Sequence, residues 1–237
     1  MNMKNPAELL HDILQNKGNP KIKLLGDSIT HGVGGSGWEQ NGRVIYKDYA
    51  QSPDSYCWGN LLRDYMKEKY GATVVNNGCT GTTVGFVSRH IPELVDDDDD
   101  LILCTIGTNN RHQYFADGEK PEKEAFLEEF YEKIFRMYSL FRDKGIPTIF
   151  IANIPASEQN EKDGEDYWRI LRMSDINECY KRLAREQGAV VLSLYDLMTA
   201  YCDESNTSIE ALLCDGLHPN DEGYRVMFEL LVKALSL

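Results

Sequence analysis

The feature that most constrains this chain is a set of short runs in which apolar residues are continuous rather than alternating. Such runs are typical of strands covered on both faces, as in a parallel sheet. Each run is bounded by Gly, Asn, Pro or charged residues, where strands commonly end. The pattern predicts five buried strands: Lys21–Leu25, Thr73–Asn76, Leu101–Ile106, Thr148–Ala152 and Ala189–Leu194.

Stretches with helical periodicity separate these runs. The clearest, Pro121–Lys144, has apolar side chains at steps of three and four residues, begins at a proline and stops before Gly145. Strands that alternate with helices predict an α/β fold, a three-layer α/β/α sandwich around a five-stranded parallel sheet. Further helices are predicted at Cys57–Tyr70, Tyr167–Gln187 and Asn220–Leu235.

The chain shows no internal repeat and no linker rich in Pro, Gly or Ser. We therefore predict a single domain over residues 1–237, with residues 1–20 as an N-terminal helical extension. That extension places Leu9, Leu10, Ile13 and Leu14 on one helical face.

Charge and composition exclude several classes of function. A net charge of −13 disfavours nucleic acid and anionic lipid as partners. No apolar run reaches the roughly 20 residues of a spanning helix, and the N-terminus lacks a secretory signal, so we expect a cytoplasmic protein. The six cysteines form no C-x-x-C pair, so we expect reduced thiols, no metal site and no cofactor.

Three segments look irregular. His31–Ser55 is long and rich in glycine, which is typical of a functional loop and raises the question of whether it gates a site. Ser157–Asp166 is polar and has the character of a flap. Asp96–Asp100 lacks the glycine turn and the ligand spacing of a calcium loop, so we interpret it as a solvated link before a strand.

Polar residues with chemical potential follow the predicted strands. In open α/β sheets, ligands bind beyond the carboxyl ends of the strands. Gly26-Asp27-Ser28 follows the first strand, a segment containing Gly78 and Gly81 the second, and Gly107-Thr108-Asn109 the third. Asp215-Gly216-Leu217-His218 precedes the last helix. We expect the four segments to meet at one edge of the sheet.

Each of these signals is modest when taken alone. Ser28 by itself fits a helix cap, and an isolated His218 fits a surface histidine. A serine nucleophile needs a base, and Asp215, three residues before His218, is placed to hold the ring by Nδ1 and leave Nε2 free for the serine proton. Gly81 or Gly78 would supply a backbone N–H to an oxyanion hole and Asn109 an amide, although turn-making and loop-capping roles are open for them.

In block order, the chain resembles the SGNH hydrolases, also called GDSL esterases. Gly26–Thr30 matches their G-D-S block, Gly107–Asn109 their G-x-N block and Asp215–His218 their D-x-x-H block. Gly81 is the better match to their backbone glycine, with Gly78 as the alternative. Asn110 departs from the G-x-N-D form of many members, which leaves the subfamily open.

The resemblance implies a flavodoxin-like sandwich and metal-free hydrolysis through an acyl-enzyme. Ser28 would be the nucleophile, His218 the base, and Asp215 the residue that orients His218. The oxyanion hole would consist of the Ser28 N–H, the Gly81 N–H and the Asn109 side chain.

The most specific hypothesis is a serine esterase acting on a small-molecule ester, with a small acyl group such as an O-acetyl on a carbohydrate. Aromatic residues over 38–58 would stack on sugar faces, or else pack that segment onto the domain. Lysophospholipase or thioesterase activity is the alternative within hydrolases, and a non-catalytic flavodoxin-like binding domain is the alternative of another class. The aromatic residues are Trp38, Tyr46, Tyr49, Tyr56 and Trp58.

Overall fold

A five-stranded parallel sheet forms the centre of the protein, in the order β2-β1-β3-β5-β7. The computed structural model describes residues 5–38 and 55–237. Because β1 is flanked by β2 on one side and by β3 on the other, the order is that of the flavodoxin-like doubly wound folds. The predicted five-stranded parallel sheet is confirmed. The strands are β1 (Lys21–Gly26), β2 (Thr73–Gly78), β3 (Leu101–Thr105), β5 (Thr148–Ala152) and β7 (Val190–Ser193).

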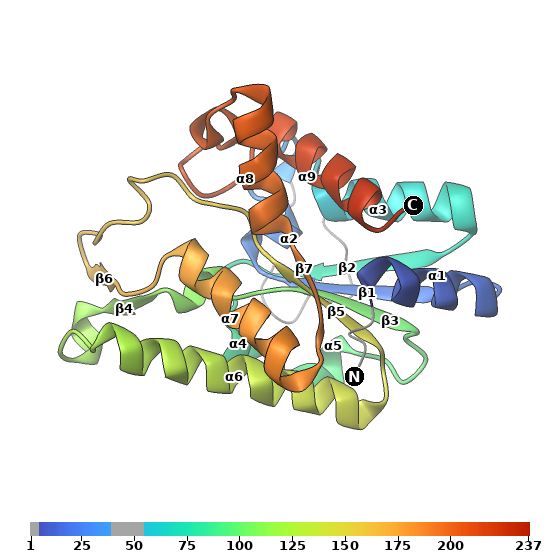
Figure 1. Ribbon diagram of the computed structural model, residues 1–237, viewed down its shortest axis with the longest axis horizontal. Helices are drawn as coiled ribbons and strands as arrows, with labels where there is room; N and C mark the ends of the chain where they lie inside the picture. The colour runs from blue at the N-terminus through green and yellow to red at the C-terminus, as the bar shows by residue number, and fades with distance from the viewer. Residues whose placement is uncertain (1–4, 39–54) are drawn as a thin grey trace.

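Helices cover both faces of this sheet and complete the three predicted layers (Figure 1). Successive strand residues point into opposite layers, as Leu24 and Leu25 of β1 do in two separate core clusters. The continuous apolar runs therefore reflect burial on both faces. One face packs against α1 (Pro6–Asn16), α3 (Trp58–Tyr70), α8 (Leu194–Ser205) and α9 (Asp221–Ala234), and the other against α4 (Val84–Arg89), α5 (Ile91–Leu94), α6 (Lys123–Lys144) and α7 (Met173–Gln187).

The N-terminal helix α1 belongs to the body of the protein. Its Asn5 side chain caps the helix by accepting from the Ala7 N–H, and Pro6 occupies the first turn. Leu9, Leu10 and Ile13 are buried in the first core cluster. Within residues 5–38 and 55–237, no helix combines the length and the apolarity needed to cross a membrane.

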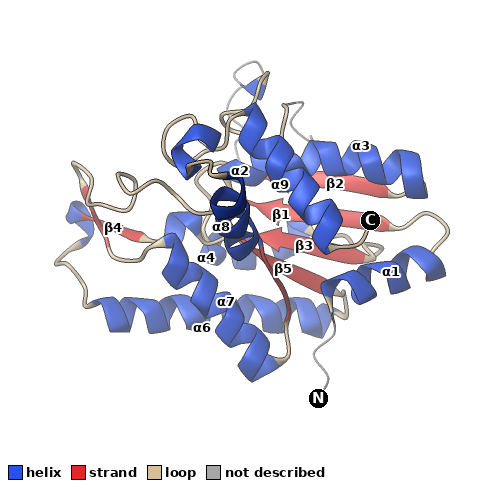
Figure 2. Cartoon of the chain, turned by 45° about the horizontal axis from the view of Figure 1, so that its top comes forward, coloured by secondary structure: helices blue, strands red, loops and turns tan. Residues whose placement is uncertain are grey.

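One predicted helix begins too early. Residues 167–187 were expected to be helical throughout, but Tyr167–Arg169 form strand β6, which pairs antiparallel with β4 (His112–Tyr114). Helix α7 begins at Met173, where the Asp175 carboxylate in the first turn accepts from the Arg172 N–H at 2.7 Å. Figure 2 shows β4 at the end of the molecule away from α1. Neither this two-stranded ribbon nor helix α8 was predicted from the sequence.

Short helices complete the connections at the carboxyl ends of the strands. Helix α2 (Ser28–His31) follows β1 directly, and η3 (Thr108–Asn110) follows β3. Two further turns are η4 (Phe115–Asp117), after β4, and η5 (Ile209–Leu212), between α8 and α9. Segments 28–31 and 108–110 are those in which the sequence placed candidate site residues.

The end of β2 lies directly against α2. A Cβ on Gly78 would lie 2.4 Å from the His31 nitrogen and 2.6 Å from the Thr30 carbonyl carbon. These are backbone atoms, which cannot rotate out of the way. Gly78 is therefore required for the close approach of β2 to the segment that carries Ser28.

We expect Gly78→Ala to lower the free energy of unfolding by about 1–3 kcal/mol, because overpacking against backbone forces a shift of α2. Urea unfolding followed by circular dichroism measures this. Gly18→Ala is the control, since a Cβ at Gly18 meets nothing within 4 Å. Equal midpoints for the two variants would contradict the close approach.

Candidate active site

The candidate site lies where β1 and β3 leave the sheet, at the point where the strand order changes direction. Asp27 caps helix α2, with Oδ1 accepting from the Ile29 N–H at 3.0 Å. Complete burial raises the pKa of Asp27, and hydrogen bonds from Thr108 and from the Ile29 N–H offset this in part. Ser28 follows immediately and is only 6% exposed. The capped turn thus fixes Ser28 at the edge of the sheet.

The structure brings Ser28, His218 and Asp215 into one hydrogen-bonded chain. Ser28 Oγ lies 2.8 Å from His218 Nε2, although the two residues are 190 positions apart in the sequence. His218 Nδ1 lies 2.7 Å from Asp215 Oδ2. With the Nδ1 proton held by the carboxylate, Nε2 is left as an acceptor for the serine proton. This is the geometry that the predicted nucleophile and base require.

Asp215 is fixed by its own turn. Its Oδ1 accepts from the backbone N–H groups of Leu217, at 3.0 Å, and His218, at 2.8 Å. Partial burial alone would raise the pKa of Asp215, but the hydrogen bonds from the His218 ring and from these backbone groups hold it well below its usual range. Asp215 therefore stays ionised at neutral pH and keeps its place beside the ring.

The geometry distinguishes the two glycines considered for the oxyanion hole. The Gly78 N–H donates to Asn76 Oδ1 at 2.9 Å, so it is already occupied. Gly81 has φ of +74° and meets nothing within 4 Å where a Cβ would stand. Within the described part of the chain, neither the Gly81 N–H nor the Ser28 N–H has a hydrogen-bond partner. Gly81, not Gly78, is thus free to donate to a ligand.

The Asn109 amide is held close to Gly81. Its Nδ2 donates to the Thr82 carbonyl at 2.8 Å, which leaves the second amide hydrogen for another acceptor. The neighbouring Asn110 Oδ1 accepts from the Val84 N–H at 2.9 Å. Two hydrogen bonds therefore hold the turn after β3 against the turn after β2. These two turns carry the predicted oxyanion donors, Asn109 and Gly81.

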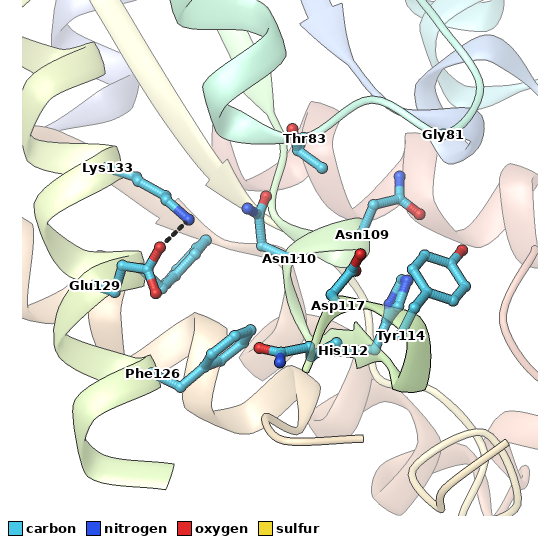
Figure 3. A pocket seen from close by; sticks show the side chains of 12 residues that line it. Gly81, Thr83, Asn109, Asn110, His112, Tyr114, Asp117, Phe126, Glu129 and Lys133 are labelled. Atoms are coloured by element: carbon cyan, nitrogen blue, oxygen red, sulfur yellow. Dashed lines mark ion pairs between the residues drawn. The ribbon is translucent and has the colours of Figure 1, made fainter. Parts of the chain in front are cut away.

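A cavity of about 460 Å³ opens beside Gly81 and Asn109. Figure 3 shows these two residues at one side and Glu129 and Lys133 of helix α6, an ion pair, at the other. Asn110 lies between them, and His112 and Tyr114 of the ribbon strand β4 lie on the side of Asn109. The lining is rich in polar and charged groups: Thr83, Asn110, His112, Gln113, Asp117, Glu129 and Lys133, with aromatic rings from Tyr114, Phe126 and Phe130.

His112 is a half-buried imidazole in this cavity. Burial, together with the positive charges of Arg169 and Arg111, lowers its pKa to about 4. The ring is therefore neutral at physiological pH, with Tyr114 edge-on at 5.0 Å between ring centroids. A neutral imidazole both donates and accepts hydrogen bonds, as a polar ligand requires.

Among the described residues, one cluster has metal-ligand spacing, Asp96, Asp98 and Asp99. It lies at the start of β1, at the opposite edge of the sheet from Ser28. Lys21 Nζ bonds Asp96 and Asp98 at 2.9 and 2.8 Å, and Lys23 Nζ bonds Asp96 at 3.0 Å. These carboxylates pair with two lysines. Asp96 and Asp98 are exposed, as expected of a solvated link before β3, whereas Asp99 is buried.

Comparison with known proteins places the chain in a family. The family model described as GDSL-like Lipase/Acylhydrolase matches residues 24–226. The chain belongs to this family. It is a carboxylic ester hydrolase, and the binding-domain alternative is set aside.

The relatives of this GDSL-family hydrolase include esterases. It is 26% identical to the isoamyl acetate-hydrolyzing esterase of Saccharomyces cerevisiae over 91% of this chain and 86% of the relative. In fold it is similar to an acetylxylan esterase from Geobacillus stearothermophilus, with a TM-score of 0.67, 17% identity and coverage of 93% and 97% of the two chains. A lipase/acylhydrolase from Enterococcus faecalis aligns with a TM-score of 0.63, 19% identity and coverage of 90% and 94%.

Several residues around the site of this GDSL-family hydrolase were not found from the sequence. His112, Glu129 and Lys133 line the cavity, but they lie on a short ribbon and a long helix, where nothing in the pattern marks them. Arg111, which is 1% exposed, follows Asn109-Asn110 directly. A charged residue so close to a buried strand end was the one available signal.

Gly81 and Gly145 offer a matched pair, since both have φ of +74° and no atom near a Cβ. We expect Gly81→Ala and Gly145→Ala each to lose about 1–2 kcal/mol of stability through left-handed strain. Only Gly81→Ala should also lose ester turnover, by roughly 10-fold or more, because strain moves an oxyanion donor. Urea unfolding and p-nitrophenyl acetate hydrolysis measure the two effects. Equal activity in both variants would remove Gly81 from the site.

Proposed function

We propose that the protein hydrolyses small acyl esters, with O-acetyl groups on a polyhydroxy alcohol such as a carbohydrate as the substrate class. Ester hydrolysis by a serine nucleophile is supported by the hydrogen-bonded series Ser28–His218–Asp215, with distances of 2.8 Å from Ser28 Oγ to His218 Nε2 and 2.7 Å from His218 Nδ1 to Asp215 Oδ2. The polar cavity beside Gly81 and Asn109 supports the substrate part.

The reaction follows from these contacts. Ser28 Oγ attacks the ester carbonyl carbon while His218 Nε2 takes the hydroxyl proton. The oxygen that becomes negative accepts from the Ser28 N–H, the Gly81 N–H and the second hydrogen of Asn109 Nδ2. The C–O bond to the alcohol then breaks, and His218 returns the proton to the departing alkoxide. Water attacks the acyl-enzyme with His218 again as base, which releases the acid and restores Ser28.

The side chains that line the cavity favour a polar substrate over a long acyl chain. The cavity lining contains a Glu129–Lys133 ion pair. A long acyl chain bound there would remove water from these charged groups without offering them hydrogen bonds, which is unfavourable. The names of two relatives, one hydrolysing isoamyl acetate and one acetylxylan, agree with an acetyl group. Lysophospholipase or thioesterase activity is the alternative within the family.

The aromatic residues that were expected to stack on sugars need one correction. Trp58 is completely buried at the start of α3, and Tyr56 packs against the same core, so both serve the fold. Tyr46 and Tyr49, with most of the proposed gating loop 31–55, lie outside the described residues. The rings that line the cavity are those of Tyr114 on β4, which is 47% exposed, and of Phe126 and Phe130 on α6.

The nucleophile is tested by reaction with diisopropyl fluorophosphate followed by intact mass spectrometry. We expect one adduct on the wild type and none on Ser28→Ala, together with a loss of turnover of roughly 10⁴-fold or more. Ser139→Ala, on the exposed face of α6, is the control and should label normally. An adduct on folded Ser28→Ala would overturn the assignment.

The substrate class is tested with p-nitrophenyl esters of increasing acyl length and with acetylated xylose against isoamyl acetate. We expect kcat/KM to fall from acetyl to octanoyl. We also expect His112→Phe to lower the preference for acetylated xylose several-fold, because both ring nitrogens are lost. The same substitution at His11, on helix α1, should leave that preference as it was. Peak activity on the octanoyl ester would favour the lysophospholipase alternative.

A further inference from the structure

Arg111 is a buried cation that the hydrolytic reaction does not use. Its side chain is 1% exposed, and all its hydrogen bonds go to protein groups. Nε donates to the Thr108 carbonyl at 3.0 Å, which ties the guanidinium to the turn that carries Asn109. Nη1 donates to Glu161 Oε2 and Nη2 to Asn160 Oδ1, each at 2.9 Å. The two outer nitrogens thus hold a different part of the chain.

The segment that Arg111 holds is in turn attached to the turn of His218. The Asn160 N–H donates to the Ser157 carbonyl at 3.0 Å, and the Ser157 N–H donates to the Gly216 carbonyl at 2.9 Å. Gly216 stands between Asp215 and His218. Its φ is +84°, and a Cβ there would lie 2.5 Å from Ser157 Oγ, so segment 157–161 fits closely against this turn.

From these contacts we propose that Arg111 is a positioning residue, which sets the distance between the oxyanion donor Asn109 and the acid–base pair Asp215–His218. Asn109 follows β3, whereas Asp215 and His218 precede α9, so no short stretch of backbone joins them. The path through Thr108, Arg111, Asn160 and Ser157 to Gly216 joins the two halves of the site through hydrogen bonds. The proposal rests on the proposed function, because it concerns the same reaction.

Glu161 makes the guanidinium geometry specific. Its Oε2 accepts from Arg111, and its Oε1 accepts from the Met173 N–H at 3.0 Å, at the start of helix α7. Both carboxylate oxygens are therefore used, and the side chain is 7% exposed. A planar guanidinium with fixed donor directions holds two acceptors in one geometry, which the single ammonium of lysine does not do.

Stability alone does not account for this arrangement. Burial and the positive charge of Arg169 together lower the pKa of Arg111 to about 10, so the group stays charged at neutral pH. Taking such a pair out of water costs about as much as its attraction returns, and well-packed apolar residues often serve stability equally well. Apolar residues, however, form no directional hydrogen bonds, so they would not fix the turn that carries Asn109 relative to segment 157–161.

The test compares Arg111→Lys, Glu161→Gln and the double variant Arg111→Met/Glu161→Leu with the wild type. Lys keeps the charge but loses the paired donors, and Gln turns an NH2 group toward either Arg111 or the Met173 N–H. The double variant removes both buried charges together. It is expected to fold even if a single variant does not, because neither charge is left buried without its partner. Lys120→Met is the control, since it removes an exposed ion pair to Asp163 in the same polar segment without reaching Arg111.

Each variant is assayed for kcat and KM on p-nitrophenyl acetate, for inhibition by an alkylboronic acid and for thermal unfolding. The boronate forms a tetrahedral adduct with the nucleophile and so reports on transition-state geometry. We expect kcat to fall roughly 10- to 100-fold with KM within about 2-fold, and the inhibition constant to rise in parallel, since small misplacements act on the transition state. Lys120→Met should match the wild type in all three.

A double variant that unfolds at a lower temperature but keeps wild-type kcat and boronate affinity would overturn the proposal and leave Arg111 a structural residue. A wild type that neither hydrolyses the ester nor binds the boronate would instead refute the proposed function. Parallel losses of kcat and boronate affinity in a folded double variant support the positioning role of Arg111.

Discussion

The register of β1 between β2 and β3 is the constraint on which the rest of the site depends. Gly26 at the end of β1 lies opposite Gly78 of β2 and opposite Thr105 of β3, so the three strands end at one level. The chain therefore leaves the sheet at neighbouring points, and Ser28, Gly81 and Asn109 all come within a few residues of that line. A slip of one residue in either pairing would turn every side chain of that strand toward the opposite layer and separate these groups.

The sheet holds this register because both faces are covered. Leu24 and Leu25 are both completely buried, in opposite clusters, so the strand has no solvent-facing side on which to shift. At the carboxyl ends of the strands, hydrogen bonds between side chains and backbone groups, rather than apolar packing, hold the chain in place. Asp27 caps α2, Asn76 occupies the Gly78 N–H, and Asn109 bonds the Thr82 carbonyl. Local hydrogen bonds thus convert an edge of the sheet into a fixed set of donors.

The five-stranded sheet and its order along the chain could be predicted from the sequence. Its strands are continuous apolar runs, which indicate burial on both faces. The meeting of Ser28 with His218 followed from strand ends rather than from any contact visible in the sequence. The β4–β6 ribbon could not be predicted in this way. Its strands are three residues each, and Tyr167–Arg169 precede a strongly amphipathic helix without a break in pattern. Trp58 was equally ambiguous, since a tryptophan at the start of a helix packs inward or outward according to tertiary contacts. Arg111 has partners 49 and 50 positions away, a pairing that no local pattern shows.

The two halves of the site are held by different means. Ser28 and Asp27 are nearly or completely buried, whereas the Asp215 side chain is 52% exposed. Asp215 and His218 nevertheless stay together, because both belong to one turn of four residues whose backbone donates to the carboxylate. The carboxylate of Asp215 and the imidazole of His218 thus belong to a single structural unit, the turn 215–218. Insertions or deletions between α8 and this turn leave the Asp–His distance as it is and change only the approach of the whole turn to Ser28. One long-range distance, rather than two, must then survive as the surrounding loops diverge, which makes this half of the site tolerant of change in the segments that lead to it.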